Sequence, residues 1–275
     1  MDVIEAHARR LPPVDDRWIH RACTREELEA GLLAGKVAGW AIHPLDNVRN
    51  NLRLLLEGDP DKLFGLTGVA GAMEFDDVLE LVAGEAGAPI DPGARSGGVW
   101  IEPGPIVDAC EAMGERLAAA ASHGESVVVA TGHPTGLALL YLELARLLHA
   151  HGATILKPAD GLEWLEEWNN AMRRIRYLDG VAMLTGDDAP VHTHRPDAMH
   201  RMLADARPDL VIGDHGFAGA AIEAGVETIS VADVNDPALI VAKAQGRTEI
   251  VVVMDDHVDP GAYWPCFQAV ASAFG

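Results

Sequence analysis

Residues that could do acid–base chemistry or bind metal ions recur directly after short apolar runs in the second half of the chain. Segments rich in His, Asp, Asn, Gly or Thr follow these runs at 131–136, 157–161, 185–194, 213–216, 232–237 and 254–257. Carboxylates combined with imidazoles suit Mg²⁺, Mn²⁺ or another first-row metal ion at a catalytic centre. The distribution predicts an active site assembled from several separate segments.

Asp214, Asp233 and Asp236 are the candidate metal ligands in this set. Asp233 and Asp236 lie three residues apart on an expected turn, so their carboxylates could hold one ion from two sides. Asp236 also suits a helix N-cap, and Asp233 suits an ordinary turn residue. Asp214 and His215 are harder to explain structurally, because glycines flank the pair and let the backbone approach a ligand closely.

The segment after the run 126–130 predicts a phosphate-binding turn. A helix expected from about residue 134 would offer its N–H groups and its dipole to an anion. The segment matches neither GxxxxGK[ST] nor GxGxxG. His133 and His215 are candidate general acids. The alternative is a glycine-rich turn in which His133 has no function. The phosphate-binding candidates here are Thr131, Gly132, Thr135 and Gly136.

Other segments contribute further candidates for binding substrate. Lys157 follows its apolar run and could orient a phosphate. His192 and His194 would share one face of a strand as a ligand pair, although a solvated loop explains them equally well. Asn51 lies in an expected helix that could close over the site. The roles of Asp255, Asp256 and His257, and of the arginines at 173, 174 and 176, stay open.

The elements that must position these residues are alternating strands and helices. Repeated strand–helix units predict an α/β fold with a mostly parallel, doubly wound, Rossmann-like sheet. The carboxyl ends of such strands meet at the edge where open α/β folds bind ligands. The expected strands are 126–130, 153–156, 181–184, 209–212, 227–231 and 249–253. Between them we expect helices at 137–150, 196–206, 218–224 and 237–244, and a helical or irregular stretch at 161–176.

Residues 1–95 predict a smaller helical part, and residues 96–275 form the expected α/β domain. A capping box at Thr24–Glu27 opens a helix that runs to about residue 33. Apolar periodicity predicts further helices at 48–56 and 74–83, and Gly and Pro predict loops at 84–105.

Composition narrows the range of partners. Lys and Arg number 21 and Asp and Glu 42, which gives a formal net charge of −21. So acidic a chain has no basic field for nucleic acid or for an anionic membrane. Its three cysteines form no CxxC motif, so neither a disulfide framework nor a thiolate zinc site is expected. With no signal-like start and no membrane-spanning run, we expect a cytoplasmic protein, and as an acidic Rossmann-like enzyme a homodimer.

Several segments together resemble a known bacterial family. The segments are ATGHPTGL at 130–137, HTH at 192–194, PDLVIGDHGFAG at 208–219, ADVNDPAL at 232–239 and MDDHVDPGAY at 254–263. Their order and spacing resemble a family of high-GC bacteria named simply phosphatase, and the resemblance spans about residues 44–265. Family members often have Gly at the position of Thr135, and the segment 164–177 has no counterpart, which makes it a candidate for substrate choice.

A fainter similarity is to metal-dependent carbohydrate phosphatases that pair a helical N-terminal part with a Rossmann-like sheet. In those enzymes Asp and Asn at strand ends hold the metal. That similarity implies Asp214, Asp233, Asn235 and Asp236 as metal-binding residues here.

The expected function is therefore a metal-dependent phosphatase that hydrolyses a phosphomonoester of a small metabolite. Asp214, Asp233 and Asp236 would hold the ion, and His133 or His215 would act as the general acid. Two alternatives stay open. One is a sugar-phosphate isomerase or lyase on the same sheet, and the other is a non-catalytic protein that binds a phosphorylated ligand.

Overall fold

A central β-sheet organises the computed structural model, which describes residues 20–69, 71, 73–167, 169–187 and 189–274. Within these residues nine strands form one sheet in the order β11-β10-β9-β3-β7-β6-β5, with β4 beside β3 and β8 beside β7. The strands are β3 (Ser126–Thr131), β4 (Thr154–Ile155), β5 (Glu163–Glu166), β6 (Ala171–Leu178), β7 (Val181–Gly186), β8 (Ala189–Pro190), β9 (Leu210–Asp214), β10 (Glu227–Ala232) and β11 (Ile250–Val253).

The parallel part of the sheet has a topological switch point beside β3. Strands β11, β10, β9, β3 and β7 run parallel, whereas β5, β6 and β8 are antiparallel additions. From β3 the chain first builds β4 and β7 on one side, then returns to build β9, β10 and β11 on the other. Ligands of open α/β folds bind at such a reversal. The predicted α/β class with a mostly parallel sheet is confirmed.

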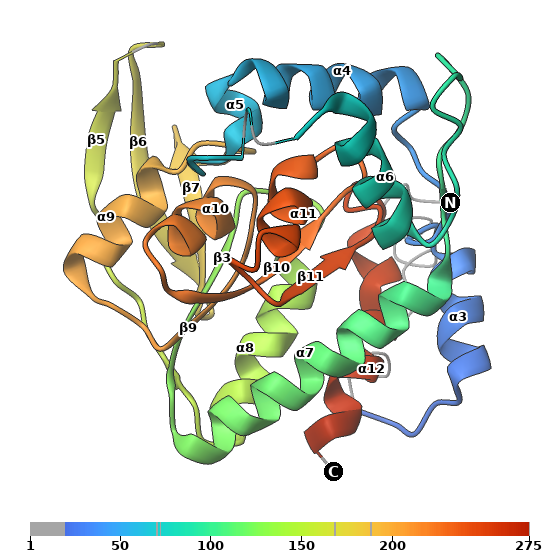
Figure 1. Ribbon diagram of the computed structural model, residues 1–275. Coiled ribbons are helices and arrows are strands. Elements are labelled where there is room, and N and C mark those ends of the chain that lie inside the picture. Colours follow the sequence, from blue (N-terminus) through green and yellow to red (C-terminus); the bar gives the residue numbers. More distant parts are fainter. Residues whose placement is uncertain (1–19, 70, 72, 168, 188, 275) are drawn as a thin grey trace, which may run out of the picture.

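Helices cover both faces of this sheet (Figure 1). Alternate side chains of β3 enter two different clusters, with Val127 and Val129 on one face and Val128 and Ala130 on the other. One face is covered by α7 (Pro103–His123), α8 (Ala138–Ala150) and α12 (Trp264–Ala271). The other is covered by α9 (Asp197–Asp205), α10 (His215–Glu223) and α11 (Pro237–Ala244). Strands buried on both faces explain the solidly apolar runs in the sequence.

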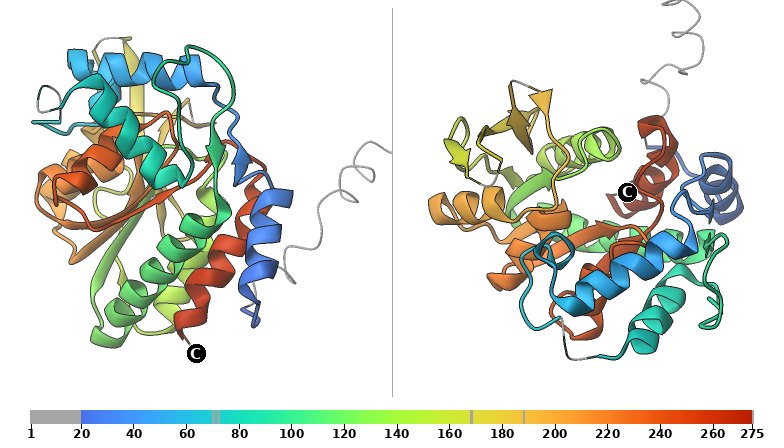
Figure 2. Two further views of the ribbon diagram at one scale, coloured as in Figure 1. Left: turned by 45° about the vertical axis from the view of Figure 1, so that its right-hand side comes forward. Right: turned by 90° about the horizontal axis from the view of Figure 1, so that it is seen from above.

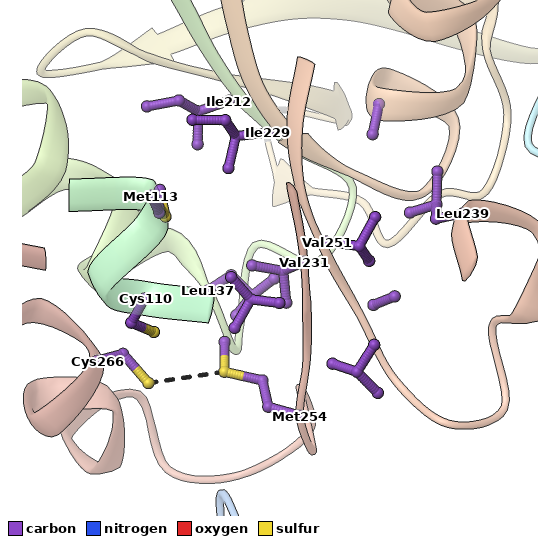
Figure 3. Close-up of a cluster of buried hydrophobic side chains, with 14 of the residues drawn as sticks. Cys110, Met113, Leu137, Ile212, Ile229, Val231, Leu239, Val251, Met254 and Cys266 are labelled. Carbon is purple, nitrogen blue, oxygen red and sulfur yellow. Dashed lines mark hydrogen bonds between the residues drawn. The ribbon is translucent and has the colours of Figure 1, made fainter. Parts of the chain in front are cut away.

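The core between the sheet and α7 and α12 is apolar and rich in sulfur. Figure 3 shows Cys110 and Met113 of α7 facing the side chains of β10 and β11, with Met254 and Cys266 beside them. The Sγ of Cys266 lies 3.7 Å from the Sδ of Met254. Cys110 and Cys266 are buried free thiols that pack as small apolar groups.

The N-terminal elements pack on the same molecule and reach over the sheet. They are α3 (Arg25–Ala34), β1 (Gly39–Trp40), α4 (Leu45–Glu57), α5 (Pro60–Leu63), α6 (Phe75–Ala86) and β2 (Trp100–Ile101), and β1 pairs antiparallel with β2. The predicted capping box of Thr24 and Glu27 opens α3. Seen from above, α4 crosses over the strands (Figure 2). Buried side chains of α3, α4 and α6 belong to one hydrophobic cluster with those of α7 and β11.

The structure differs from the sequence expectations in several places. The stretch 161–176, expected to be helical or irregular, belongs to the β5–β6 hairpin, and Asn170 adopts the left-handed conformation at its turn with φ 55°. Helix α7 had no predicted counterpart, because Pro103, Pro105 and Gly114 mask its periodicity. Helix α8 begins at Ala138, which agrees with the helix expected at 137–150 but not with the start at about residue 134 expected for the phosphate-binding turn.

The chain closes with short 3₁₀ turns at Pro260–Tyr263 and Ser272–Phe274. Among the described helices, none combines the length and the apolar character needed to cross a membrane.

Candidate metal centre and active site

His215 lies at the centre of a buried cluster beside the switch point. Its Nε2 lies 3.1 Å from Asp236 Oδ2 and 3.6 Å from Asp256 Oδ2, and its Nδ1 lies 3.2 Å from Asp214 Oδ1. All four side chains are buried. The three carboxylates come from the ends of β9, β10 and β11, so the structure brings together segments that are far apart in the sequence.

The backbone at His215 is strained. Its φ is 44°, in the left-handed region that non-glycine residues rarely adopt. A residue keeps such a conformation only where its surroundings hold it there, and functional sites are where such strain concentrates. Here the strain aims the imidazole at carboxylates that leave the neighbouring strands.

Two glycines explain how the segments approach so closely. A Cβ at position 132 would collide with the carbonyl oxygen of Thr193. The two backbones are also joined by a hydrogen bond of 2.9 Å from Thr193 N to Gly132 O. A Cβ at position 136 would collide with the carbonyl oxygen of Asp256. Gly132 and Gly136 therefore let the turn after β3 pack against two other strand ends.

More histidines surround His215. His192 stacks on its ring at 5.1 Å between centroids and an interplanar angle of 19°. The Nε2 atoms of His192 and His194 lie 3.2 Å apart, although residues 191–195 are not a strand. His133 Nε2 lies 3.1 Å from His257 Nδ1, and the rings of His133 and His192 are 4.6 Å apart.

Two overlapping sets of side chains could hold a metal ion. The ligand atoms of His192, His194 and His215 lie within 4.8 Å of one another, and so do those of His215, Asp236 and Asp256. Five of the predicted site residues (Asp214, Asp236, His192, His194 and His215) thus lie in one cluster.

The structure distinguishes the two roles expected for Asp236, a helix N-cap and a residue of the site. It occupies the N-cap position of α11, but its side chain makes no capping hydrogen bond. Its Oδ2 contacts His215 instead. Asp233 is engaged on both oxygens, since Oδ1 accepts the N–H of Val234 at 2.5 Å and Oδ2 lies 2.7 Å from His43 Nδ1.

The amides from α4 hold the Asp233–Asp236 turn in place. Asn51, 5% exposed, donates from Nδ2 to the carbonyl oxygen of Asn235 at 2.9 Å. Asn235 in turn donates to Asn47 Oδ1 at 3.0 Å. Helix α4 does lean over the strand ends, as expected, but Asn51 contacts the metal-side turn and not an open surface.

The Thr131–Gly136 turn does not offer the open set of N–H groups that a phosphate cradle requires. Gly132 N donates to Asp214 Oδ1 at 2.7 Å, and His133 N donates to Thr131 Oγ1 at 2.9 Å. Gly136 N donates to His133 O. Helix α8 begins only at Ala138, so the turn itself is not the first turn of that helix. Thr135 is exposed. The turn shapes the cluster through its glycines, and its described hydrogen bonds remain within the chain.

Lys157 is not brought to the cluster. Strand β4 is two residues long and pairs with the start of β3, whereas β7 occupies the same side of β3 at its end. Lys157 therefore lines a different cavity, together with Arg146, His149 and Asp179. The cation that the structure places beside the histidines is Lys62, whose Nζ lies 3.5 Å from His194 Nδ1.

Sequence reasoning missed several residues of the cluster. Asp256 and His257 follow the last strand, but strand alternation alone could not tell which of them turns inward. Asp255 turns away and accepts the N–H of Ile42 at 2.7 Å. His43 and Asp61 lie in the helical N-terminal part, where nothing in the local pattern marks them, and Asp61 Oδ2 contacts His194 Nδ1 at 2.9 Å.

Burial and charge divide the carboxylates into two groups. Burial, with Asp255 and Asp236 nearby, raises the pKa of Asp233 to about 6, although His43 opposes the shift. Burial and the charge of Asp233 raise the pKa of Asp256 well above its usual value. For Asp214 and Asp236 burial also acts upward, but contact with His215 outweighs it and lowers the pKa of each. The cluster thus holds more negative charge than its imidazoles balance.

The histidines are divided in the same way. Burial acts to lower the pKa of His215, but Asp236 and Asp214 outweigh it and raise that pKa well above the usual value. Burial and the nearby His215 lower the pKa of His133 to about 4 and that of His192 to about 3. His133 and His192 are therefore neutral at pH 7, which is the form that binds metals and accepts protons.

The donor set fits a divalent cation. Among the described residues, buried oxygens without a hydrogen-bond partner include Asp214 Oδ2, Asp256 Oδ2 and Asn235 Oδ1. Such orphaned acceptors are costly unless a ligand or ion satisfies them. Carboxylate and amide oxygens beside neutral imidazoles are the ligands of a catalytic divalent metal.

Comparisons with known proteins identify the family to which the chain belongs. The model of the family called Phosphatase matches residues 23–274. A Streptomyces coelicolor protein named as a phosphatase is 34% identical over 247 residues, which cover 88% of this chain and 92% of its relative. Family and relative both support a hydrolase of the phosphatase class. Neither match supports the fainter similarity to carbohydrate phosphatases. With nearly its whole length matched, the chain belongs to the bacterial Phosphatase family.

Proposed function

We propose that this protein is a metal-dependent phosphomonoesterase that acts on a small phosphorylated metabolite at the His215 cluster. The observation that carries the proposal is the convergence of Asp214, Asp236 and Asp256 on one imidazole, with buried carboxylate oxygens that no described donor satisfies. Family membership supports the hydrolase class, and the cluster supports the dependence on metal.

The ligands we assign are Asp214, Asp236, Asp256 and His215, with His192 and His194 completing the second set. The carboxylates that favour a proton on His215 would favour a divalent ion in its place, so metal binding would release that proton. Asn235 contributes its unpaired Oδ1. Asp233 positions His43, since both of its oxygens are engaged. So many imidazoles favour Mn²⁺ over Mg²⁺, because Mg²⁺ prefers an all-oxygen shell. A bound divalent ion would supply positive charge to the phosphoryl oxygens.

His133 is the proton acceptor in this proposal. A general acid must carry a proton at the working pH, and the lowered pKa of His133, about 4, leaves its imidazole neutral at pH 7. Its buried Nδ1 has no hydrogen-bond partner among the described residues, whereas its Nε2 is held by His257. We therefore assign His133 to accept a proton from the attacking water, and not to protonate the leaving alcohol.

Release of inorganic phosphate tests the proposal. The protein would be stripped with EDTA and then assayed on sugar, glycerol and nucleoside phosphates with Mn²⁺, Mg²⁺, Co²⁺ or Ni²⁺ restored. We expect release that requires metal and is fastest with Mn²⁺ or Co²⁺. Release that is undiminished after EDTA treatment would overturn the metal dependence. Turnover of a sugar phosphate without phosphate release would identify an isomerase or lyase, and tight binding without turnover would identify a binding protein.

A further inference from the structure

A cavity opens directly beside the histidine pair. Its volume is about 730 Å³, which is in the range of small-molecule sites. His192 and His194 line it on the side of the cluster, and residues 59–67, around α5, form one wall. The opposite wall comes from the β5–β6 hairpin and the segment after His194, including Glu166, Arg173 and Arg195. A phosphomonoester bound at the cluster would place its leaving group in this cavity.

Most charges around this cavity are already matched by a neighbour. Glu166, 6% exposed, receives Arg173 through Nε and Nη2 at 2.8 Å each. Asp61 contacts Lys62 and His194, each at 2.9 Å. Asp59 caps the N-terminus of α5, where its side chain accepts the N–H of Asp61. These carboxylates and cations hold the walls in shape and offer little net charge to a ligand.

Arg195 differs from the other charged residues of the cavity. Its side chain is 43% exposed, against 14% for Arg173. Its Nε donates a hydrogen bond to Asp197 at 2.9 Å and makes a longer contact with Glu166 at 3.5 Å. Among the described residues, Arg195 makes its hydrogen bond and its ion-pair contact through Nε, and no hydrogen bond engages its Nη atoms, although the residue lines the cavity and is partly exposed. The Nη edge is the part of arginine that binds carboxylates and phosphates in a bidentate manner.

We propose that Arg195 is a specificity-determining residue that binds a second anionic group, a carboxylate or a phosphate, on the leaving part of the substrate. The inference rests on the proposed phosphatase function and names its substrate class. Arg195 directly follows His194, and both residues line this cavity. A substrate with a second anion near its phosphoryl group, such as a phosphorylated hydroxy acid or a compact bisphosphate, would contact both the cluster and Arg195.

Matched substrates test this assignment. Glycerate 2-phosphate and glycerol 2-phosphate differ only by a carboxylate in place of a hydroxymethyl group. We expect wild-type kcat/KM to favour the glycerate ester by about 10- to 100-fold, the contribution of a charge-assisted hydrogen bond. Arg195→Gln should lose that preference while it hydrolyses glycerol 2-phosphate as the wild type does, which also shows that the variant is folded. Glycerol 1,2-bisphosphate against glycerol 2-phosphate tests whether a phosphate can serve as the second anion in place of a carboxylate.

Arg201→Gln is the matched control. Arg201 lies on α9 and stacks on Trp164 at 4.3 Å outside this cavity, so its loss should leave the preference unchanged. Equal kcat/KM within both substrate pairs for the wild type, or an equal loss on all substrates for Arg195→Gln, would overturn the role of Arg195 and leave the phosphatase proposal standing. No phosphate release from any of these esters with any metal would overturn both.

Discussion

At the scale of single residues, the site depends on charges that oppose one another at close range. Asp214 has the clearest double role, because Oδ1 accepts the N–H of Gly132 at 2.7 Å while Oδ2 is buried without a partner. The first oxygen ties the turn after β3 to the end of β9. The second oxygen is available to an ion, so this one side chain has both a structural contact and a proposed metal contact.

Asp214→Asn separates these two roles. The amide oxygen can still accept from Gly132, so the midpoint of thermal unfolding should change little. The lost charge should lower kcat by about 100-fold or more, as expected when an interaction that stabilises the transition state is removed. Steady-state phosphate release and thermal unfolding measure the two effects. Full activity in this variant would remove Asp214 from the metal site.

At the scale of elements, α4 and the β10–α11 turn form one unit. Asn51 on α4 bonds the backbone of Asn235, whereas the neighbouring Asn50 is exposed and contacts only Arg53 among the described residues. The two asparagines therefore form a matched pair, one that holds the metal-side turn and one that does not.

Asn51→Ala should destabilise the protein by about 1–3 kcal/mol, since it leaves a buried carbonyl without its donor. It should also lower phosphate release, because the turn that carries Asp233 and Asp236 loses its support. Asn50→Ala should change neither quantity by more than about 0.5 kcal/mol or its kinetic equivalent. Urea unfolding and kcat measured on both variants decide the matter. Equal effects of the two substitutions would contradict the role of Asn51.

Glu223 at the end of α10 supplies a pH-dependent tie to the segment that follows α5. It accepts from Thr67 and Arg247. Burial acts upward, but these hydrogen bonds outweigh it and lower the pKa of Glu223 to about 2, from an unfolded value near 4.5. A depressed folded pKa means that the stabilisation is complete above pH 4.5 and is lost as the pH falls toward 2.

The difference in unfolding free energy between wild type and Glu223→Gln should therefore be larger at pH 7 than at pH 3. Subtracting the variant removes the contribution of the other carboxylates that titrate in this range. Urea unfolding at the two pH values measures the difference, and a difference independent of pH would contradict the assigned tie.

Element type was predictable wherever burial and periodicity agree. The strands that became β3, β9, β10 and β11, and helix α11 at Pro237–Ala244, were predictable because each is apolar over its full length and bounded by turn residues. The β5–β6 hairpin was not, because its exposed face carries Leu165 and Met172 and so hides the alternation of a strand. Lys157 lies away from the cluster because β4 ends after two residues, and no local sequence pattern predicts so short a strand.

At the scale of the whole molecule, topology accounts for which candidates converged. The parallel strands β9, β10 and β11 bring Asp214, Asp236 and Asp256 to one edge, as sequence order indicated for all three segments, although it left open which of Asp255 and Asp256 faces the site. The histidines from the N-terminal part and from residues 192–194 arrive through tertiary packing, so no spacing rule predicts their distance from His215. A cluster assembled in this way is complete only in the folded chain, and an ion bound there should stabilise that state.

Addition of Mn²⁺ to EDTA-stripped protein should raise the midpoint of thermal unfolding, because the ligands are gathered only in the native state. Asp256→Asn should reduce the shift, and Asp108→Asn, an exposed residue of α7 paired with Arg25, should keep it. An equal shift in all three proteins would mean that the ion binds elsewhere.

The most direct measurement is Mn²⁺-dependent phosphate release by the wild type, Asp256→Asn and Asp108→Asn, assayed side by side after EDTA treatment. The account predicts that wild type and Asp108→Asn regain activity as Mn²⁺ is restored, while Asp256→Asn stays at least about 100-fold lower at saturating metal. Full Mn²⁺-restored activity in Asp256→Asn, or activity in the wild type that never depended on metal, would contradict a metal-dependent phosphatase centred on His215.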